Sequence, residues 1–527
     1  MKSLIAATLF LVIFTLAACD PETPDDEFTA DDIAPASTAF QEDVDVCYQI
    51  FPISYADSTS DGDGDLMGIV ENVEYLSEDL GVDCVWLNPI NPSPSYHKYN
   101  VRDYYDIDET FGDMDDFETF AETMEEHDIK IVKDLVINHT DFGHIWFRRS
   151  REDEGDMRDW YSWRDEPGHN WHEYNGEYYY GSFWDQMPEL NFDNPDVRER
   201  VYHIAEYWLE RGVDGFRIDA ARHIYDDHQY PDDVDTTQEN VDFFREFNAE
   251  IKNIDEDAFI VGEIWSESER YVSQYYEGMD SAFNFKFADE IVGAISNDRD
   301  NGAIEGLIDS RNAYEEVRED YIDSVFLSNH DQRRIMNAFQ YNEDRAKLAA
   351  HVLMTMPGIS WIYYGEEIGM SGSGSDPEKR QPFVWETDSP YHAEGVMDGH
   401  HDSIAGWDDH NQDLPGAYEQ LEDEDSLLNT YIELIELKQT RDVLGNTSPI
   451  SALETDSNAF MAYERGGGDD RYLVVHNLNA QERTTPFQAD SYDIVYTSHD
   501  AEIEEDITMQ GRSTVILDVE GDASLIE

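Results

Sequence analysis

The sequence is poor in cysteine, in positive charge and in long apolar runs. Three cysteines in 527 residues exclude a small scaffold held together by many disulfides. Lysine and arginine together number 34 against 119 aspartates and glutamates, which gives a formal net charge of −85 at pH 7. A field of this sign repels nucleic acid and anionic lipid head groups, so we expect neither as a partner. Beyond the N-terminal segment, no apolar run is long enough to cross a membrane.

The acidic residues are spread over the whole chain, which indicates a property of the surface rather than one binding patch. Hydrophobic residues make up 40% of the chain and aromatic residues 13%, enough for a packed core. This composition excludes a disordered acidic protein and disfavours one that only buffers calcium. Because repulsion between carboxylates weakens in molar salt, we expect a halophilic protein.

The N-terminal segment has the features of an export signal. Lys2 supplies a positive start, a short apolar run follows, and Leu16–Cys19 resembles a bacterial lipobox whose cysteine is acylated. An ordinary secretory peptide is the alternative. We expect a lipoprotein signal over 1–19, lipidation at Cys19 and an acidic tether over 20–43. The protein would be secreted across the inner membrane, then anchored at the cell envelope or released outside, with no other membrane contact.

Two cysteines, Cys47 and Cys84, remain in the mature chain. Each lies in an apolar run typical of a buried strand. Buried free thiols are the interpretation that we favour, although two neighbouring strands could bring the pair together as a disulfide.

Eight short apolar runs alternate with helical patterns along the chain. They are Val44–Pro52, Val82–Pro89, Ile129–Asn138, Val213–Asp219, Ala258–Trp265, Ser281–Phe285, Tyr321–Asn329 and Ile359–Tyr364. Strands that alternate with helices form a parallel sheet, and eight is the number that closes a (β/α)8 TIM barrel. We therefore predict an α/β fold with a catalytic barrel over 44–140 and 195–441.

Two segments do not fit the barrel pattern. Residues 141–194, after the third strand, are too many for a loop and rich in aromatic residues, so we predict a small inserted domain, called domain B. After the helical run Ser426–Thr440, alternating patterns such as Arg471–Asn477 predict a C-terminal antiparallel β-sandwich over 442–527.

Charged and polar side chains end four of the predicted strands, which is where a barrel of this kind carries its functional groups. The strand ends are Asn138-His139, Arg217-Ile218-Asp219, Gly262-Glu263 and Asn329-His330-Asp331. The Arg217–Asp219 pair alone could be an ion pair that only stabilises the core. Several carboxylates on one rim are what hydrolysis of a glycosidic bond requires, and the aromatic residues of domain B suit the flat faces of sugar rings.

These strand ends resemble, in order, motifs of the α-amylase superfamily, glycoside hydrolase family thirteen. The matching segments are Asp134–His139, Gly215–His223, Gly262–Trp265 and Phe326–Asp331, with further likenesses at Ser95–Tyr105, Met187–Asn191 and Gly358–Met370. Lys98 and Asn100 stand where the family usually has glycine and aspartate. The motif at Met187–Asn191 resembles that of bacterial α-amylases intermediate between oligo-1,6-glucosidases and neopullulanases.

The resemblance implies roles for three carboxylates. Asp219 would be the nucleophile, Glu263 the general acid and base, and Asp331 the group that holds the sugar hydroxyls. Arg217 would keep Asp219 ionised. A double displacement of this kind retains the α configuration.

The resemblance also implies the substrate contacts, which are His97, Tyr99, His139, Arg217, Arg222, His223 and His330. Ala220 and the pair Arg222–His223 favour α-1,4 bonds, so we expect an endo-hydrolase of starch and maltooligosaccharides. We expect the protein to be a monomer. An exo-acting α-glucosidase, a neopullulanase or a transglycosylase on the same site are alternatives. A glucan-binding surface lipoprotein is the non-enzymatic alternative.

Residues Asp57–Asp65 predict a Ca²⁺ site. Oxygen-bearing side chains alternate there with glycines, the pattern that a hard cation needs. The run resembles the family's calcium loop, with Asp57, Thr59, Asp61, Asp65 and the Asp63 carbonyl as ligands, and a solvated acidic loop is the alternative. The resemblance implies a second calcium site at Asn138, Glu189 and the His223 carbonyl.

Overall fold

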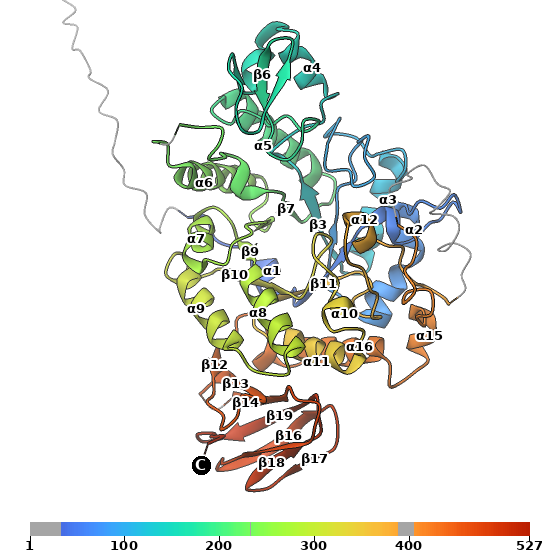
Figure 1. Ribbon diagram of the computed structural model, residues 1–527, viewed down its shortest axis with the longest axis vertical. Helices are drawn as coiled ribbons and strands as arrows, with labels where there is room; N and C mark the ends of the chain where they lie inside the picture. Colours follow the sequence, from blue (N-terminus) through green and yellow to red (C-terminus); the bar gives the residue numbers. More distant parts are fainter. Residues whose placement is uncertain (1–32, 232, 388–404, 469, 527) are drawn as a thin grey trace, which may run out of the picture.

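The computed structural model describes residues 33–231, 233–387, 405–468 and 470–526 (Figure 1). The predicted signal peptide, the lipidation site at Cys19 and the first part of the predicted tether lie outside the described residues.

Eight parallel strands close into the predicted barrel, in the order β1-β11-β10-β9-β8-β7-β3-β2. They are β1 (Val46–Ile50), β2 (Cys84–Leu87), β3 (Lys130–Leu135), β7 (Gly215–Ile218), β8 (Phe259–Gly262), β9 (Ser281–Phe283), β10 (Ile322–Phe326) and β11 (Ile359–Tyr363). Gln49 on β1 pairs with Trp86 on one side and Tyr363 on the other, which joins the first strand to the last. The predicted fold class is confirmed.

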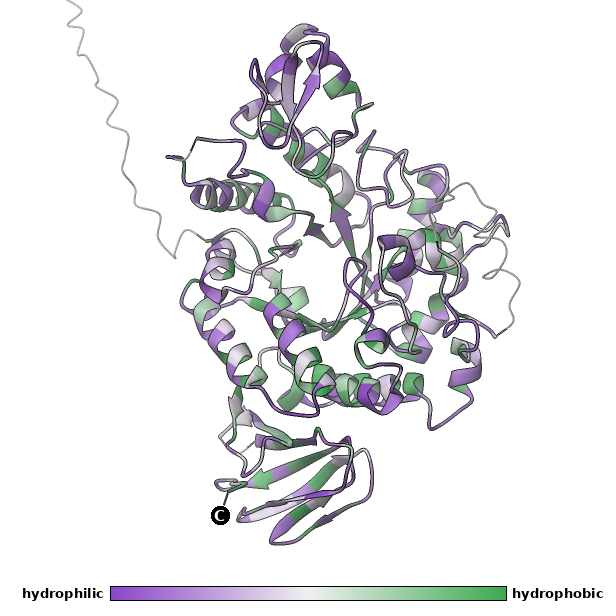
Figure 2. Cartoon of the chain, in the orientation of Figure 1, coloured by the Kyte–Doolittle hydropathy of each residue, from purple (hydrophilic) through white to green (hydrophobic). Residues whose placement is uncertain are grey.

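Helices surround the barrel. The longer ones are α3 (Met114–Glu126), α5 (Pro195–Leu209), α6 (Thr236–Ile254), α8 (Phe285–Ser296), α9 (Ala303–Glu315), α11 (Glu343–Met354) and α16 (Leu427–Gln439). Shorter ones are α1 (Thr38–Glu42), α2 (Leu66–Glu71), α7 (Glu269–Ser273), α10 (Ile335–Ala338), α12 (Asp376–Lys379) and α15 (Ala417–Leu421). Many show hydrophobic and hydrophilic bands in Figure 2, as expected of helices with one buried face. In the described residues no helix has the length and apolarity that a membrane span needs.

Helix α3 shows how the sequence specifies these elements. The Asp113 carboxylate caps its first turn by accepting the backbone N–H groups of Asp115 and Asp116, and the Asp116 carboxylate accepts the backbone N–H of Asp113. Phe117, Phe120 and Met124 recur at helical spacing and are buried. One face of the helix therefore packs on the barrel while its acidic face meets solvent.

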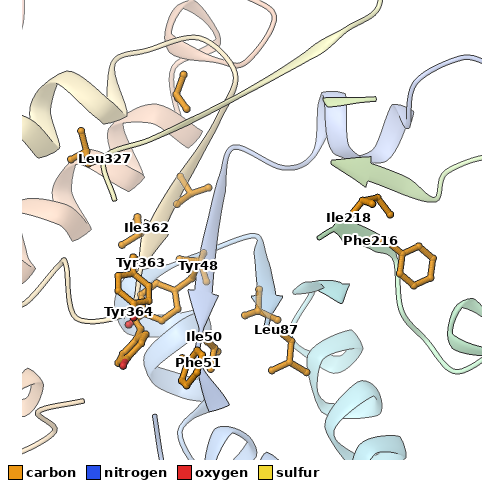
Figure 3. Packing of buried hydrophobic residues seen from close by; sticks show 14 of the residues in the cluster. Tyr48, Ile50, Phe51, Leu87, Phe216, Ile218, Leu327, Ile362, Tyr363 and Tyr364 are labelled. Carbon is orange, nitrogen blue, oxygen red and sulfur yellow. The ribbon is translucent and has the colours of Figure 1, made fainter. Parts of the chain in front are cut away.

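The core has two layers, because successive strand residues point to opposite sides of a sheet. Ile50, Leu87 and Ile362 lie in the layer between strands and helices, part of which is drawn in Figure 3. Trp86 and Trp361, at alternate positions, belong to a separate cluster. In this second layer Trp86 donates a hydrogen bond to Asp134, so the layer contacts the polar residues near the carboxyl ends of the strands.

Residues 34–42 pack against the barrel. The prediction that the tether extends to Asp43 was therefore wrong for these residues. The Ala36 N–H donates to Asp320 and the Ser37 hydroxyl to the Asp257 carbonyl. The Phe40 ring stacks on Phe259 at a centroid distance of 4.3 Å. Since Asp257 and Asp320 precede β8 and β10, helix α1 covers the N-terminal end of the barrel, opposite to the strand ends that carry the carboxylates.

Cys47 and Cys84 form a disulfide between β1 and β2. The two residues pair directly in the ladder, their Cα atoms are 4.5 Å apart, and both are buried. Our preference for free thiols was wrong. The register of two neighbouring parallel strands decides whether the cysteines meet, and a single sequence does not contain that register.

Domain B and the C-terminal sheets lie at opposite ends of the barrel (Figure 1). Domain B contains α4 (Ile145–Arg151) and the antiparallel strands β4 (Trp163–Arg164), β6 (Glu177–Tyr180) and β5 (Trp171–Tyr174). The C-terminal part has one sheet of β12 (Ile450–Ala452), β13 (Phe460–Gly467), β14 (Asp470–Asn477), β19 (Ser513–Glu520) and β16 (Ser491–Thr497). Its other sheet holds β15 (Arg483–Pro486), β18 (Asp506–Met509) and β17 (Ala501–Ile503), with a shared apolar cluster. The antiparallel sandwich is as predicted.

The disulfide predicts a loss of stability when it is removed. The double variant Cys47→Ser/Cys84→Ser should lose roughly 3–4 kcal/mol of unfolding free energy, because the bond restricts the unfolded chain. Urea unfolding of wild type and variant measures the loss. Peptide mass spectrometry after alkylation in denaturant is the second check, and free thiols at both positions without a reductant would contradict the bond.

Candidate active site

Arg217 stands at the centre of the polar cluster, near the carboxyl end of β7, with only 1% of its side chain exposed. Its guanidinium lies 2.9 Å from Asp134 on β3, 2.7 Å from Asp219 after β7 and 3.0 Å from Glu263 after β8. The three strands are neighbours in the barrel, and Asp134 pairs with Arg217 in the ladder. One buried cation thus gathers three carboxylates.

One guanidinium cannot neutralise three buried carboxylates, so the cluster favours a bound proton. Burial raises the pKa of Glu263, and Arg217 only partly opposes the effect. Asp134 accepts bonds from Arg217, Tyr99 and Trp86, which stabilise its charge. Burial also raises the pKa of Asp134, and it raises that of Asp219 well above its usual range, because Arg217 does not fully compensate either carboxylate. The proton therefore belongs to the coupled cluster, and Glu263 as its donor is the role that the resemblance implies.

Ala220, which follows Asp219, connects this residue to Glu263. Its φ is 49°, in the left-handed region, which costs a non-glycine residue about 1–2 kcal/mol. In this conformation its backbone N–H donates to Glu263 Oε2 at 2.9 Å. The strained backbone after Asp219 therefore fixes Glu263 beside it.

Asp331, after β10, is the fourth carboxylate of the site. Its Oδ1 lies 2.7 Å from Arg380 and its Oδ2 lies 3.2 Å from His330 Nε2. Burial would raise the pKa of Asp331, but His330 and Arg380 outweigh it and lower this pKa to about 2. Asp331 is therefore a charged acceptor, suited to hydrogen bonds from hydroxyl groups.

Tyr99 and His330 form a stacked pair of rings, with centroids 5.5 Å apart and planes 4° from parallel. The Tyr99 hydroxyl donates to Asp134 at 2.9 Å, and its carbonyl lies 3.0 Å from His139 Nε2. The His97 ring lies 6.0 Å from the Tyr99 ring. Burial lowers the pKa of His330 to about 3 and those of His97 and His139 to about 4, so all three are neutral at pH 7.

Arg222 and His223 lie at the outer edge of the site rather than at the cluster. Arg222 donates to the Trp265 carbonyl at 3.0 Å, and His223 pairs with Asp226 at 2.7 Å. The Phe183 ring of domain B lies 5.3 Å from the His223 ring. These residues border the side of the site next to Glu263, where a leaving group would lie.

Sequence reasoning missed three polar residues that build the site. Asp134 was recognised in a motif without a role, although a buried aspartate within a strand is itself a signal. Gln49 lies in β1, a strand that carries no family motif, and its side chain is 2.8 Å from His330 Nδ1. Arg380 directly follows the short helix α12, which is too short for a periodic pattern to reveal.

Residues 57–65 form a loop that its own aspartates hold together. Asp57 accepts the backbone N–H groups of Thr59, Ser60 and Gly62, at 2.7–2.9 Å. Asp65 accepts from Ser58 and Gly68. Among the described residues no group of three His, Cys, Asp or Glu side chains forms a metal site. The oxygen donors suit Ca²⁺ by type, but backbone donors already occupy several of them.

Asn138 and Glu189 fit a cation better. Asn138 Oδ1 and Glu189 Oε2 are buried, and neither has a hydrogen-bond partner. Burial raises the pKa of Glu189 to about 8, and the side chain of Asn138 is close enough to affect it. Two unpaired buried oxygen acceptors are what a bound cation would satisfy.

Arg380 gives a prediction about pH. In Arg380→Met the partly exposed Asp331 loses a cation, so its lowered pKa should rise by about 1–3 units. Activity on a maltooligosaccharide, the substrate that the resemblance implies, should therefore be lost at a higher pH on the acidic side. The measurement is kcat/KM against pH. Lys379→Met is the control, because the Lys379 ammonium donates to the backbone carbonyl of Asp331 and pairs with Asp376. Identical acidic limbs in wild type and Arg380→Met would contradict the role.

Comparisons with known proteins agree with this geometry. A family model described as alpha amylase, catalytic domain, matches residues 49–447, and one described as the alpha-amylase SusG C-terminal domain matches residues 460–516. The alpha-amylase 3 of Dictyoglomus thermophilum is 39% identical over 487 residues, which cover 90% of this chain and 93% of that protein.

Two further relatives span nearly the same length. An oligo-1,6-glucosidase of Bacillus cereus is 30% identical over 519 residues, which cover 83% of this chain and 90% of that protein. The crystal structure of an alpha-amylase from H. orenii has a TM-score of 0.81 and 33% identity, and the match covers 91% of this chain and 100% of that one. The chain belongs to the α-amylase family of glycoside hydrolases, family thirteen.

Proposed function

We propose that this glycoside hydrolase is an endo-acting, retaining enzyme for α-1,4 bonds in starch and maltooligosaccharides. The observation that carries the proposal is the Arg217 cluster. It holds an aspartate and a glutamate on one cation, 2.7 and 3.0 Å from its nitrogens. A nucleophile and a proton donor so placed can act on the same glycosidic bond.

The proposed reaction has two displacements. Asp219 attacks the anomeric carbon while Glu263 protonates the leaving oxygen, so the C–O bond breaks and a β-glycosyl ester forms on Asp219. Glu263, now ionised, takes a proton from water, whose oxygen attacks the same carbon and releases Asp219. Two inversions leave the product in the α configuration. Asp331, as an anion, accepts hydrogen bonds from the sugar hydroxyls.

The preference for internal α-1,4 bonds has weaker support. The small side chain of Ala220 and the edge position of Arg222 and His223 favour it. A relative that matches over nearly its whole length is named an alpha-amylase. Another relative that matches over most of its length is named an oligo-1,6-glucosidase. This name favours the alternative of an exo-acting glucosidase that uses the same carboxylates.

The products decide between these alternatives. With starch, maltotriose and panose as substrates in molar salt with calcium, we expect mixed maltooligosaccharides from starch and no cleavage of panose. Proton NMR should show α-anomers at early times. Glucose from panose with starch spared would contradict endo action, and β-anomers would contradict the double displacement. Glu263→Gln is the control and should lower kcat at least a hundredfold.

We propose that Ca²⁺ binds at Asn138 and Glu189, with the His223 carbonyl as a third ligand, and less firmly in the 57–65 loop. Calcium would compensate the two unpaired oxygens and link β3 to domain B. At a concentration a hundred times its Kd, calcium should add about 2.7 kcal/mol to the unfolding free energy. Chelation should lower the unfolding free energy of the wild type by this amount. It should leave that of Glu189→Gln unchanged, because this variant lacks a calcium ligand. The same comparison in Asp61→Ala tests the loop, and equal melting of all proteins with and without chelator would contradict binding.

We propose that the enzyme is halophilic, which the net charge of −85 supports. Salt at 1 M reduces the Debye length to about 3 Å and so weakens repulsion between surface carboxylates. The melting temperature should rise steadily between dilute buffer and 2 M NaCl, while the oligomeric state stays monomeric by light scattering. A melting temperature that falls with salt would contradict this adaptation.

We also propose, from Lys2 and the Leu16–Cys19 segment alone, that the chain is exported and anchored by a lipid at Cys19. Fractionation of expressing cells tests the anchor. Wild type should sediment with membranes and Cys19→Ser should not, whereas equal distribution of the two would contradict it.

A further inference from the structure

Lys98 is a buried lysine with a left-handed backbone, in the loop between β2 and α3. Its φ is 60° and it is 2% exposed. A non-glycine residue costs about 1–2 kcal/mol in this region, whereas glycine costs almost nothing. Burying an ammonium group adds a further cost unless the charge is paired. Two costs at one position indicate that the side chain contributes something that glycine could not.

The partner of Lys98 is Asp108, at the other end of the same loop. The ammonium lies 2.8 Å from Asp108 Oδ1, and both side chains are at most 8% exposed. Asp108 Oδ2 accepts the Ser93 N–H at 2.9 Å, and its Oδ1 also accepts the Thr110 N–H. Burial raises the pKa of Asp108, but Lys98, together with the hydrogen bonds from Ser93 and Thr110, outweighs this effect and lowers the pKa. Asp108 therefore joins the two ends of the loop through Lys98 and Ser93.

Side chains alternate along this part of the loop. His97 and Tyr99 border the carboxylate cluster, while Lys98 and Asn100 are buried behind them. The Asn100 amide donates to Asp141 at 2.8 Å, so the neighbouring anchor ties the loop to the start of domain B. Since Tyr99 lies between these two anchors, its ring position depends on both.

We propose that the Lys98–Asp108 pair is a positioning device that holds Tyr99 and His97 where the reacting sugar binds. The inference rests on the proposed glucan hydrolysis and assigns to it two residues that touch no substrate. Without the ion pair, the loop populates other conformations, and substrate must select the competent one. Apparent affinity then falls by the fraction that remains competent, while the chemical step in the bound enzyme is unchanged.

The test is Lys98→Met, which keeps the length of the side chain and removes its charge. We expect KM for a maltooligosaccharide to rise about tenfold while kcat stays within a factor of two. Hydrogen exchange of the backbone over residues 93–101 should become faster, and this readout does not require activity. Asp108→Asn should have the same effects, and the double variant should be no worse than either single one.

A matched control is Lys252→Met. Lys252 forms another buried pair, 3.2 Å from Asp280, at the opposite end of the barrel. This variant should lose stability with KM and exchange in 93–101 unchanged, which separates positioning from general destabilisation. Unchanged KM and unchanged exchange in folded Lys98→Met would overturn the inference. If wild type cleaves no α-glucan, the proposed function fails, and the exchange comparison still decides whether the pair orders the loop.

Discussion

The structure of the active site depends on one buried cation that three carboxylates share. Arg217 can hold Asp134, Asp219 and Glu263 only because β3, β7 and β8 are adjacent in the barrel. Breaking a buried ion pair by removing one partner typically costs 3–5 kcal/mol. The closed barrel stabilises this unfavourable concentration of charge. The excess of negative charge in turn raises the pKa values of the carboxyl groups, so the cluster retains a proton of the kind that general acid catalysis needs.

Other parts of the molecule support this cluster from different sides. Asp331 is kept ionised by the Arg380 cation, 2.7 Å away, since His330 is neutral at pH 7. Tyr99 stacks on His330, and its loop is held behind the site by buried polar pairs. Helix α1 and the disulfide lie at the N-terminal ends of the barrel strands, opposite to the carboxylates. They therefore affect stability rather than chemistry. Function is therefore concentrated at the carboxyl ends of the strands.

Much of this could be predicted from the sequence, because strand patterns and strand-end motifs are local. The eight strands, domain B and the sandwich follow from short-range periodicity. The disulfide could not be predicted, since it depends on the register of β1 against β2. Arg380 lies in a segment without periodicity, and its partner Asp331 is distant in sequence. The packing of residues 34–42 was missed because acidic composition masks the few apolar contacts of Phe40.

Asp219 is the group that we expect to bond to the sugar during the reaction. A fluorinated glucosyl fluoride, whose glycosyl ester hydrolyses slowly, would trap the intermediate, and peptide mass spectrometry would locate it. One added fluoroglucosyl group is expected on the peptide that contains Asp219, and none in Asp219→Asn. Label on another carboxylate, or turnover of the reagent without any covalent product, would contradict it.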